Sequence, residues 1–223
     1  MNKRNILIIV IILLVLGLGF GIYKMVNKKE VNNNEINNNT NEALDNSGVS
    51  NNSNILVAYF SKKGENYNVG KVDVGNTALV AGYITEYLNA DSFEIVPINE
   101  YPDSYDECLK VATKEKNDKA RPEIKNKLDN IDTYDTIFIG YPIWWGDMPM
   151  IIYSFLEEYN FDGKTIIPFN THEGSGSSGT YDTIKNKLTN SSINTKGLAL
   201  QGKVAREEDG KNKTIKWLKE LGY

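Results

Sequence analysis

Two adjacent tryptophans lie in the stretch Gly140-Tyr141-Pro142-Ile143-Trp144-Trp145-Gly146-Asp147, between an apolar run at 136–139 and a segment with helical periodicity. This order predicts a loop at the carboxyl end of a buried strand, where open α/β sheets bind ligands. Adjacent side chains on an extended turn cannot both enter one core. We therefore expect at least one indole at the rim, where it can stack on a planar ligand. The alternative is that both rings cap the end of the sheet.

Apolar runs of strand length alternate with segments of helical period on both sides of this loop. This alternation predicts an α/β fold with a parallel sheet covered on both faces. Strands are expected at 55–60, 93–98, 136–140, 165–169 and about 193–200. Helices are expected at 78–88, from a capping-box pattern at 104–107 to about 117, after Asp147, and at 210–221.

Individual positions within these helices carry further expectations. Asp147 and Pro149 predict an N-cap and an early-turn proline for the helix that follows the tryptophans. One apolar stripe of the 78–88 helix is expected to contain residues at fourfold spacing and their neighbours: Leu79, Tyr83 and Tyr87, with Val80, Ile84 and Leu88 beside them. Trp217 in the last helix is expected in the core.

The amino-terminal part of the chain differs in composition from the rest. Residues 6–23 contain no charged side chain, and basic residues flank them on both sides. That length is at the short end of what crosses a bilayer, so we expect a membrane anchor over 1–26. A cleaved signal peptide is the alternative, but Gly17-Leu18-Gly19 is a poor cleavage site and no cysteine follows for a lipobox.

Three regions are therefore expected: the anchor over 1–26, a disordered Asn-rich linker over 27–53, and a globular domain over 54–223. The flanking charges do not fix the orientation of the anchor. The short amino-terminal tail favours a globular domain outside the cytoplasm.

Composition excludes several functional classes. The net charge of −4 comes without a clustered basic face, which argues against nucleic-acid binding. Cys108 is the chain's single cysteine, so no internal disulfide can form. With His172 as the single histidine, far from Cys108, no metal site is expected.

Several motifs in the same order resemble those of the flavodoxin family. They are GYPIWWGDMP at 140–149, YFSKKGENY at 59–67, Gly75-Asn76-Thr77, and THEGSG at 171–176. The similarity runs from about 55 to 202 and is greatest to a bacterial branch with a longer GENY…GNT phosphate loop. The resemblance implies FMN as cofactor and a three-layer, doubly wound, five-stranded parallel sheet in the order 2-1-3-4-5.

The resemblance implies that the first loop binds the FMN phosphate. Ser61, Asn76 and Thr77 match the family's phosphate-binding positions, and Lys62 or Lys63 can add positive charge. Hydroxyls and backbone N–H groups at a helix amino terminus form a ready anion site. Residues 64–74 separate the two halves of this motif, so the path of the loop and the role of 65–67 stay open. An ordinary strand-to-helix turn is the alternative.

The second loop is expected to hold the flavin ring. Trp144 or Trp145 is expected to stack on the isoalloxazine, and Pro142 to stiffen the approach. Gly146 is a catalytic candidate, because a glycine can flip its peptide and turn its carbonyl toward flavin N5–H after reduction.

The third loop is expected to wrap the pyrimidine edge of the flavin. The candidate residues there are Thr171, His172, Gly174, Ser175 and Gly176. His172 is the second catalytic candidate, as a donor to the flavin or as the acid that protonates a bound acceptor. The alternative is a packing or positioning role.

Three functions remain open at this point. The first is a membrane-tethered FMN protein that transfers electrons with a redox partner protein or a membrane quinone. The second is an NAD(P)H-dependent FMN reductase or quinone-type oxidoreductase, in which NAD(P)H binds directly over the flavin because the sequence has no separate dinucleotide fingerprint. The third is a flavin-free interaction scaffold. Arg121-Pro122-Glu123 is expected to latch the segment before the third strand, with no chemical role.

Overall fold

A computed structural model describes residues 54–223 of the protein. The predicted anchor at 1–26 and linker at 27–53 lie outside the described residues. Between residues 54 and 223, no helix has the length and apolar character needed to cross a membrane.

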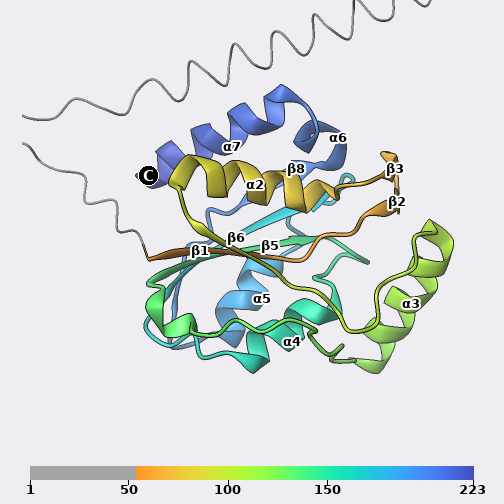
Figure 1. Ribbon diagram of the computed structural model, residues 1–223, viewed down its shortest axis with the longest axis horizontal. Coiled ribbons are helices and arrows are strands. Elements are labelled where there is room, and N and C mark those ends of the chain that lie inside the picture. The colour runs from red at the N-terminus through yellow and green to blue at the C-terminus, as the bar shows by residue number, and fades with distance from the viewer. Residues whose placement is uncertain (1–53) are drawn as a thin grey trace, which may run out of the picture. The chain divides into compact units, whose positions relative to one another are not determined.

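A parallel sheet runs through the centre of the domain (Figure 1). Its strands are β1 (Ile55–Tyr59), β4 (Asp91–Glu94), β5 (Thr136–Pro142), β6 (Thr165–His172), β7 (Ser192–Ile193) and β8 (Leu198–Gln201). The order is β4-β1-β5-β6, with β7 and β8 both paired to β6. The expected order 2-1-3-4-5 is confirmed, with one correction: the fifth strand is split. The break lies beside Pro168 in β6, which has no N–H to donate to a ladder.

Helices cover both faces of the sheet, which confirms the three layers (Figure 1). The first face carries α2 (Asn76–Leu88), α6 (Gly202–Ala205) and α7 (Glu208–Leu221), and the second carries α4 (Met150–Glu158) and α5 (Thr180–Lys187). Side chains alternate between the two cores: Val57 packs with Phe138 on the first face, and Leu56 packs with Ile137 on the second. A strand buried on both faces must be apolar throughout, which is why the sequence shows continuous apolar runs.

The remaining elements lie outside these layers. Helix α3 (Tyr105–Asp118) stands beside the sheet (Figure 1) and contacts α4 and the short strand β2 (Gly64–Asn66). Strand β2 pairs with β3 (Gly70–Val72) in an antiparallel hairpin inside the first loop. A 3₁₀ turn, η1 (Ile131–Thr133), precedes β5.

Some local expectations are corrected. Strand β4 lies at 91–94 rather than 93–98. Asp147 is not the N-cap of α4, because Pro149 occupies that position and the Asp147 carboxylate accepts bonds from Met148 N–H and the Tyr153 hydroxyl instead. The expected stripe of α2 is buried in part: Val80 and Ile84 lie in the core, whereas Tyr87 is exposed.

Other local expectations are confirmed. Trp217 is buried against Phe138, and its indole N–H donates to the Lys196 carbonyl. Arg121 latches the segment after α3 to α4 through two bonds to Glu157, at 2.7 and 2.9 Å.

Candidate functional site

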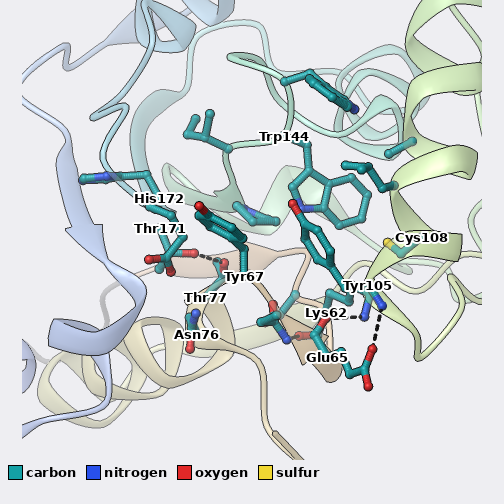
Figure 2. A pocket seen from close by; sticks show the side chains of 18 residues that line it. Lys62, Glu65, Tyr67, Asn76, Thr77, Tyr105, Cys108, Trp144, Thr171 and His172 are labelled. Atoms are coloured by element: carbon teal, nitrogen blue, oxygen red, sulfur yellow. Dashed lines mark hydrogen bonds between the residues drawn. The ribbon is translucent and has the colours of Figure 1, made fainter. Parts of the chain in front are cut away.

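A cleft lies where the carboxyl ends of β1, β5 and β6 meet (Figure 2). Nine of the residues expected to bind the cofactor line it: Ser61, Lys62, Asn76, Thr77, Pro142, Trp144, Trp145, Thr171 and His172. The other four expected residues, Gly146, Gly174, Ser175 and Gly176, belong to the neighbouring loops but are not among its lining residues. Strand β1 lies between β4 and β5 in the sheet. The chain goes from β1 to β4 on one side of β1 and then crosses to β5 on the opposite side, so the cleft lies at a topological switch point.

The first loop closes on itself despite its long excursion. The Ser61 hydroxyl accepts the N–H of Ala78 at 3.0 Å, and a Cβ added at Gly75 would lie 2.3 Å from Ser61 Oγ and 2.4 Å from the Lys62 carbonyl oxygen. Only a glycine permits this approach of the two chain segments. The structure thus brings Ser61 beside the start of α2, as the sequence predicted.

The amino terminus of α2 has the character of an anion site. Its first turn carries no acidic residue, and the first N–H groups of a helix have no partner inside it. Thr77 Oγ1 lies 2.8 Å from Thr171 Oγ1, so the hydroxyls of the first and third loops meet there. Arg206 adds a guanidinium bonded to Asn76 Oδ1 and to the Val74 carbonyl. Sequence reasoning missed Arg206, because no local pattern connects it to a helix so far back in the chain.

Lys62 is buried at the wall of this cleft, with 9% of its surface exposed. Its ammonium group donates to the carbonyls of Lys63 at 2.9 Å, Glu65 at 3.1 Å and Asp103 at 3.2 Å. An ammonium has three hydrogens to donate, so all of them are engaged by the backbone. Lys62 therefore contributes positive charge to the cleft while its hydrogen bonds hold the first loop against the segment before α3.

The second loop is a tight turn from Trp144 to Asp147. The backbones of these two residues exchange hydrogen bonds of 2.9 and 3.0 Å, and Trp145 and Gly146 between them have φ values of 53° and 69°. Positive φ at both central positions is the geometry of a type I′ turn. For a bulky residue such as Trp145 it costs about 1–2 kcal/mol.

The turn separates the two indoles as the sequence predicted. Trp144 packs edge-on against Phe60 and Tyr101, with ring centroids 5.5 and 5.0 Å away. Trp145 is 54% exposed at the rim. Its carbonyl accepts a bond from Lys116 of α3. Strain at an exposed, cleft-lining aromatic residue is typical of ligand sites.

The third loop is held in place by the side chains beneath it. Asn170 donates to the Gly176 carbonyl at 3.1 Å, and four residues have positive φ: Gly174, Gly176, Ser178 and Gly179. His172 Nδ1 accepts the Gly174 N–H at 2.9 Å, and burial lowers the pKa of its imidazole. The observed contact of His172 is therefore one that positions the loop.

Helix α3 and the β2–β3 hairpin form a wall that the sequence did not predict. From α3 come Tyr105, Cys108, Leu109 and Ala112, and from the hairpin come Glu65, Asn66 and Tyr67. Burial raises the pKa of the Cys108 thiol to about 11, and the nearby Lys62 charge opposes the shift. A protonated, buried thiol is a poor nucleophile, so Cys108 serves as an apolar lining residue.

The family model described as flavodoxin matches residues 54–221. The chain belongs to the flavodoxin family. No curated protein matches the chain. Among solved structures, a putative flavoprotein from Bacteroides eggerthii is 31% identical with a TM-score of 0.61, over 77% of this chain and 99% of its own. One from Bacteroides uniformis is 29% identical with a TM-score of 0.60, over 75% and 98%.

A third flavodoxin-fold structure is a flavoprotein from Lactobacillus acidophilus in complex with FMN. It is 23% identical with a TM-score of 0.51, over 68% of this chain and 95% of its own. At that identity the likeness supports the fold.

Proposed function

We propose that this flavodoxin-family protein binds FMN and transfers electrons, and that residues 1–26 tether it to a membrane. Family membership and flavoprotein neighbours support FMN as the cofactor and a redox role. The observation that carries the proposal is the convergence at one cleft of an anion site and a strained, exposed indole.

The residues present fit FMN. The Ser61 and Thr77 hydroxyls and the first turn of α2 suit a phosphate dianion. Arg206 is not among the lining residues, and its guanidinium holds the Asn76 side chain of that turn. Trp145 offers a flat surface to a planar ring. Bound FMN supplies the redox centre, and the protein binds it, orients it and limits the access of water.

The turn at Trp145 and Gly146 is where this chain can respond to the redox state. Lys116 already engages the Trp145 carbonyl, so the Gly146 carbonyl is the group proposed to turn toward flavin N5–H. Gly146→Ala adds a Cβ at a φ of 69°, a conformation that favours glycine. We expect the first one-electron potential to fall by about 40 mV, from the loss of one hydrogen bond of about 1 kcal/mol. Unchanged one-electron potentials would remove this role.

The partners follow from the tether. A domain held at a membrane is placed to exchange electrons with a membrane quinone or a partner redox protein. The test is stepwise photoreduction of the FMN-loaded, full-length protein, followed by addition of NADH and NADPH to the oxidised form. Reduction in two resolved steps with no response to nicotinamide supports electron transfer. Rapid single-step bleaching by NAD(P)H indicates the reductase instead.

FMN and riboflavin titrations of the apoprotein test the anion site. These ligands differ by the phosphate, so Thr77→Val is expected to weaken FMN binding about 5- to 10-fold and to leave riboflavin binding unchanged. Thr133→Val, an exposed position in η1, is the matched control. Failure of the wild-type protein to bind FMN would refute the proposal and favour a flavin-free scaffold.

A further inference from the structure

The β2–β3 hairpin is fastened to α3 on one side of the cleft. The Glu65 N–H donates to the Asp103 carbonyl at 2.8 Å, and Glu65 Oε2 accepts the N–H of Tyr105, the first residue of α3, at 3.0 Å. A Cβ added at Gly64 would lie 2.8 Å from the same Asp103 carbonyl oxygen. The hairpin thus lies directly against the chain that leads into α3. Glu65 also supplies the carboxylate that the amino terminus of that helix favours.

The tip of the hairpin lies close to the third loop. Val69 of the tip, Glu173 of the third loop and Asn76 of α2 all lie around Gly202. A Cβ at Gly202 would lie 2.1 Å from Glu173 Oε1 and 3.0 Å from Val69 Cγ2, so these groups are closely packed. The hairpin therefore lines the cleft, bonded to the start of α3 at Glu65 and packed near Glu173 at its tip.

Tyr67 lies at the tip between these two contacts. It lines the cleft and is 57% exposed, and its ring stacks on Tyr105 with centroids 5.8 Å apart and planes 30° apart. In Figure 2 the ring stands between Tyr105 and the Thr171–His172 side of the cleft. The third loop, residues 172–179, contains no Phe, Tyr or Trp. Aromatic surface therefore reaches the cleft from the second loop, the hairpin and α3.

We propose that Tyr67 is a binding residue for the flavin ring, which it covers from the hairpin as an aromatic wall additional to Trp145. This inference rests on the proposed FMN function. Tyrosine has two side-chain torsions, so ordering it costs little, and the stacking on Tyr105 holds the ring in place before a ligand arrives. Ligand binding then gains contact area without having to organise the hairpin.

The test compares FMN and riboflavin binding to full-length apoprotein variants. Because Tyr67 contacts the ring, Tyr67→Ala weakens the binding of both ligands. The expected loss of affinity is about 5- to 150-fold, the range for nucleic-acid bases stacked on aromatic side chains. This differs from Thr77→Val, which affects FMN alone. Tyr67→Phe keeps the ring and binds both ligands within about twofold of wild type. Tyr87→Ala, at an exposed tyrosine on α2, is the control and changes neither affinity.

Residual fluorescence of the bound flavin is the second measurement. A stacked phenol quenches it by donating an electron, so the fluorescence rises in Tyr67→Ala and also in Tyr67→Phe, which lacks the phenol, whereas Tyr87→Ala leaves it unchanged. The inference is overturned if Tyr67→Ala binds both ligands as wild type does, or if it weakens FMN and spares riboflavin. In both cases the proposed function stands, provided that wild type binds FMN. If wild type binds no FMN, the proposed function fails and this inference fails with it.

Discussion

Replacing Lys62 by methionine tests whether the buried ammonium group holds the first loop together. The change keeps the length of the side chain and removes its three hydrogen bonds to the Lys63, Glu65 and Asp103 carbonyls. Hydrogen bonds from a charged donor contribute about 1.5–3 kcal/mol each. Two effects make the total loss smaller than the sum of the three bonds. The Asp103 carbonyl still accepts a hydrogen bond from the Glu65 N–H in the variant, and the methionine removes the cost of burying a charge. We expect a net loss of about 2 kcal/mol.

Urea denaturation and thermal melting of the apoprotein measure this loss. For a domain of this size, 2 kcal/mol corresponds to a fall in Tm of about 4–8 °C. Lys63→Met is the matched control, because its side chain is 65% exposed and its ion pair with Glu100, at 3.7 Å, is also exposed. Such pairs contribute about 0–1 kcal/mol. If the two variants unfold with the same free energy, the Lys62 bonds do not stabilise the loop and the reasoning is wrong.

Three further predictions concern the rest of the domain. Gly140→Ala places a Cβ 2.1 Å from Phe169 Cζ in the neighbouring strand, so it should lower the free energy of unfolding in urea by about 2–3 kcal/mol. Gly82→Ala adds a Cβ in open space on α2 and should raise the free energy of unfolding by up to about 1 kcal/mol. The pKa of Glu157 is lowered to about 2 by hydrogen bonds from its two cationic partners, so its stabilising effect is present above about pH 4.5 and is lost as the pH falls towards 2. Because the group is partly exposed, the difference between wild type and Glu157→Gln should reach only about 0.5–1 kcal/mol at pH 7 and shrink towards pH 2. Cys108, with its pKa raised to about 11, should react with a disulfide reagent at pH 8 at least about tenfold more slowly in the folded than in the urea-unfolded protein; equal rates would contradict its burial.

The sheet could be predicted from the sequence because its signal is local. β1, β5 and β6 are buried on both faces, so each contains a continuous apolar run, which in β6 is limited to residues 166–169. The separation of Trp144 from Trp145 was also predictable, since adjacent side chains on a turn point in different directions. Which indole would be exposed was not, because Phe60 and Tyr101, which enclose Trp144, come from other parts of the chain.

The far wall of the cleft could not be predicted, because its signal is not local. β2 and β3 are three-residue strands with no apolar alternation, and Glu65 and Lys62 act through Asp103 and Tyr105, about 40 residues away. Gly64 and Gly70, which begin β2 and β3 with positive φ, were the only local indication that the inserted residues form a defined structure. Helix α5 is short and mostly polar, so it also lacked a clear apolar period.

The insertion between Ser61 and Gly75 has an energetic consequence for the anion site. A longer loop costs more entropy to close, although the cost grows only slowly with its length. Here the Lys62 bonds and the docking of the hairpin on α3 offset that cost during folding, so the phosphate need not supply the energy to close the loop. The same attachments fix Tyr67 above the cleft. Loosening the hairpin should therefore weaken ligand binding through both the anion site and the aromatic wall, whereas truncating Tyr67 alone removes only the wall.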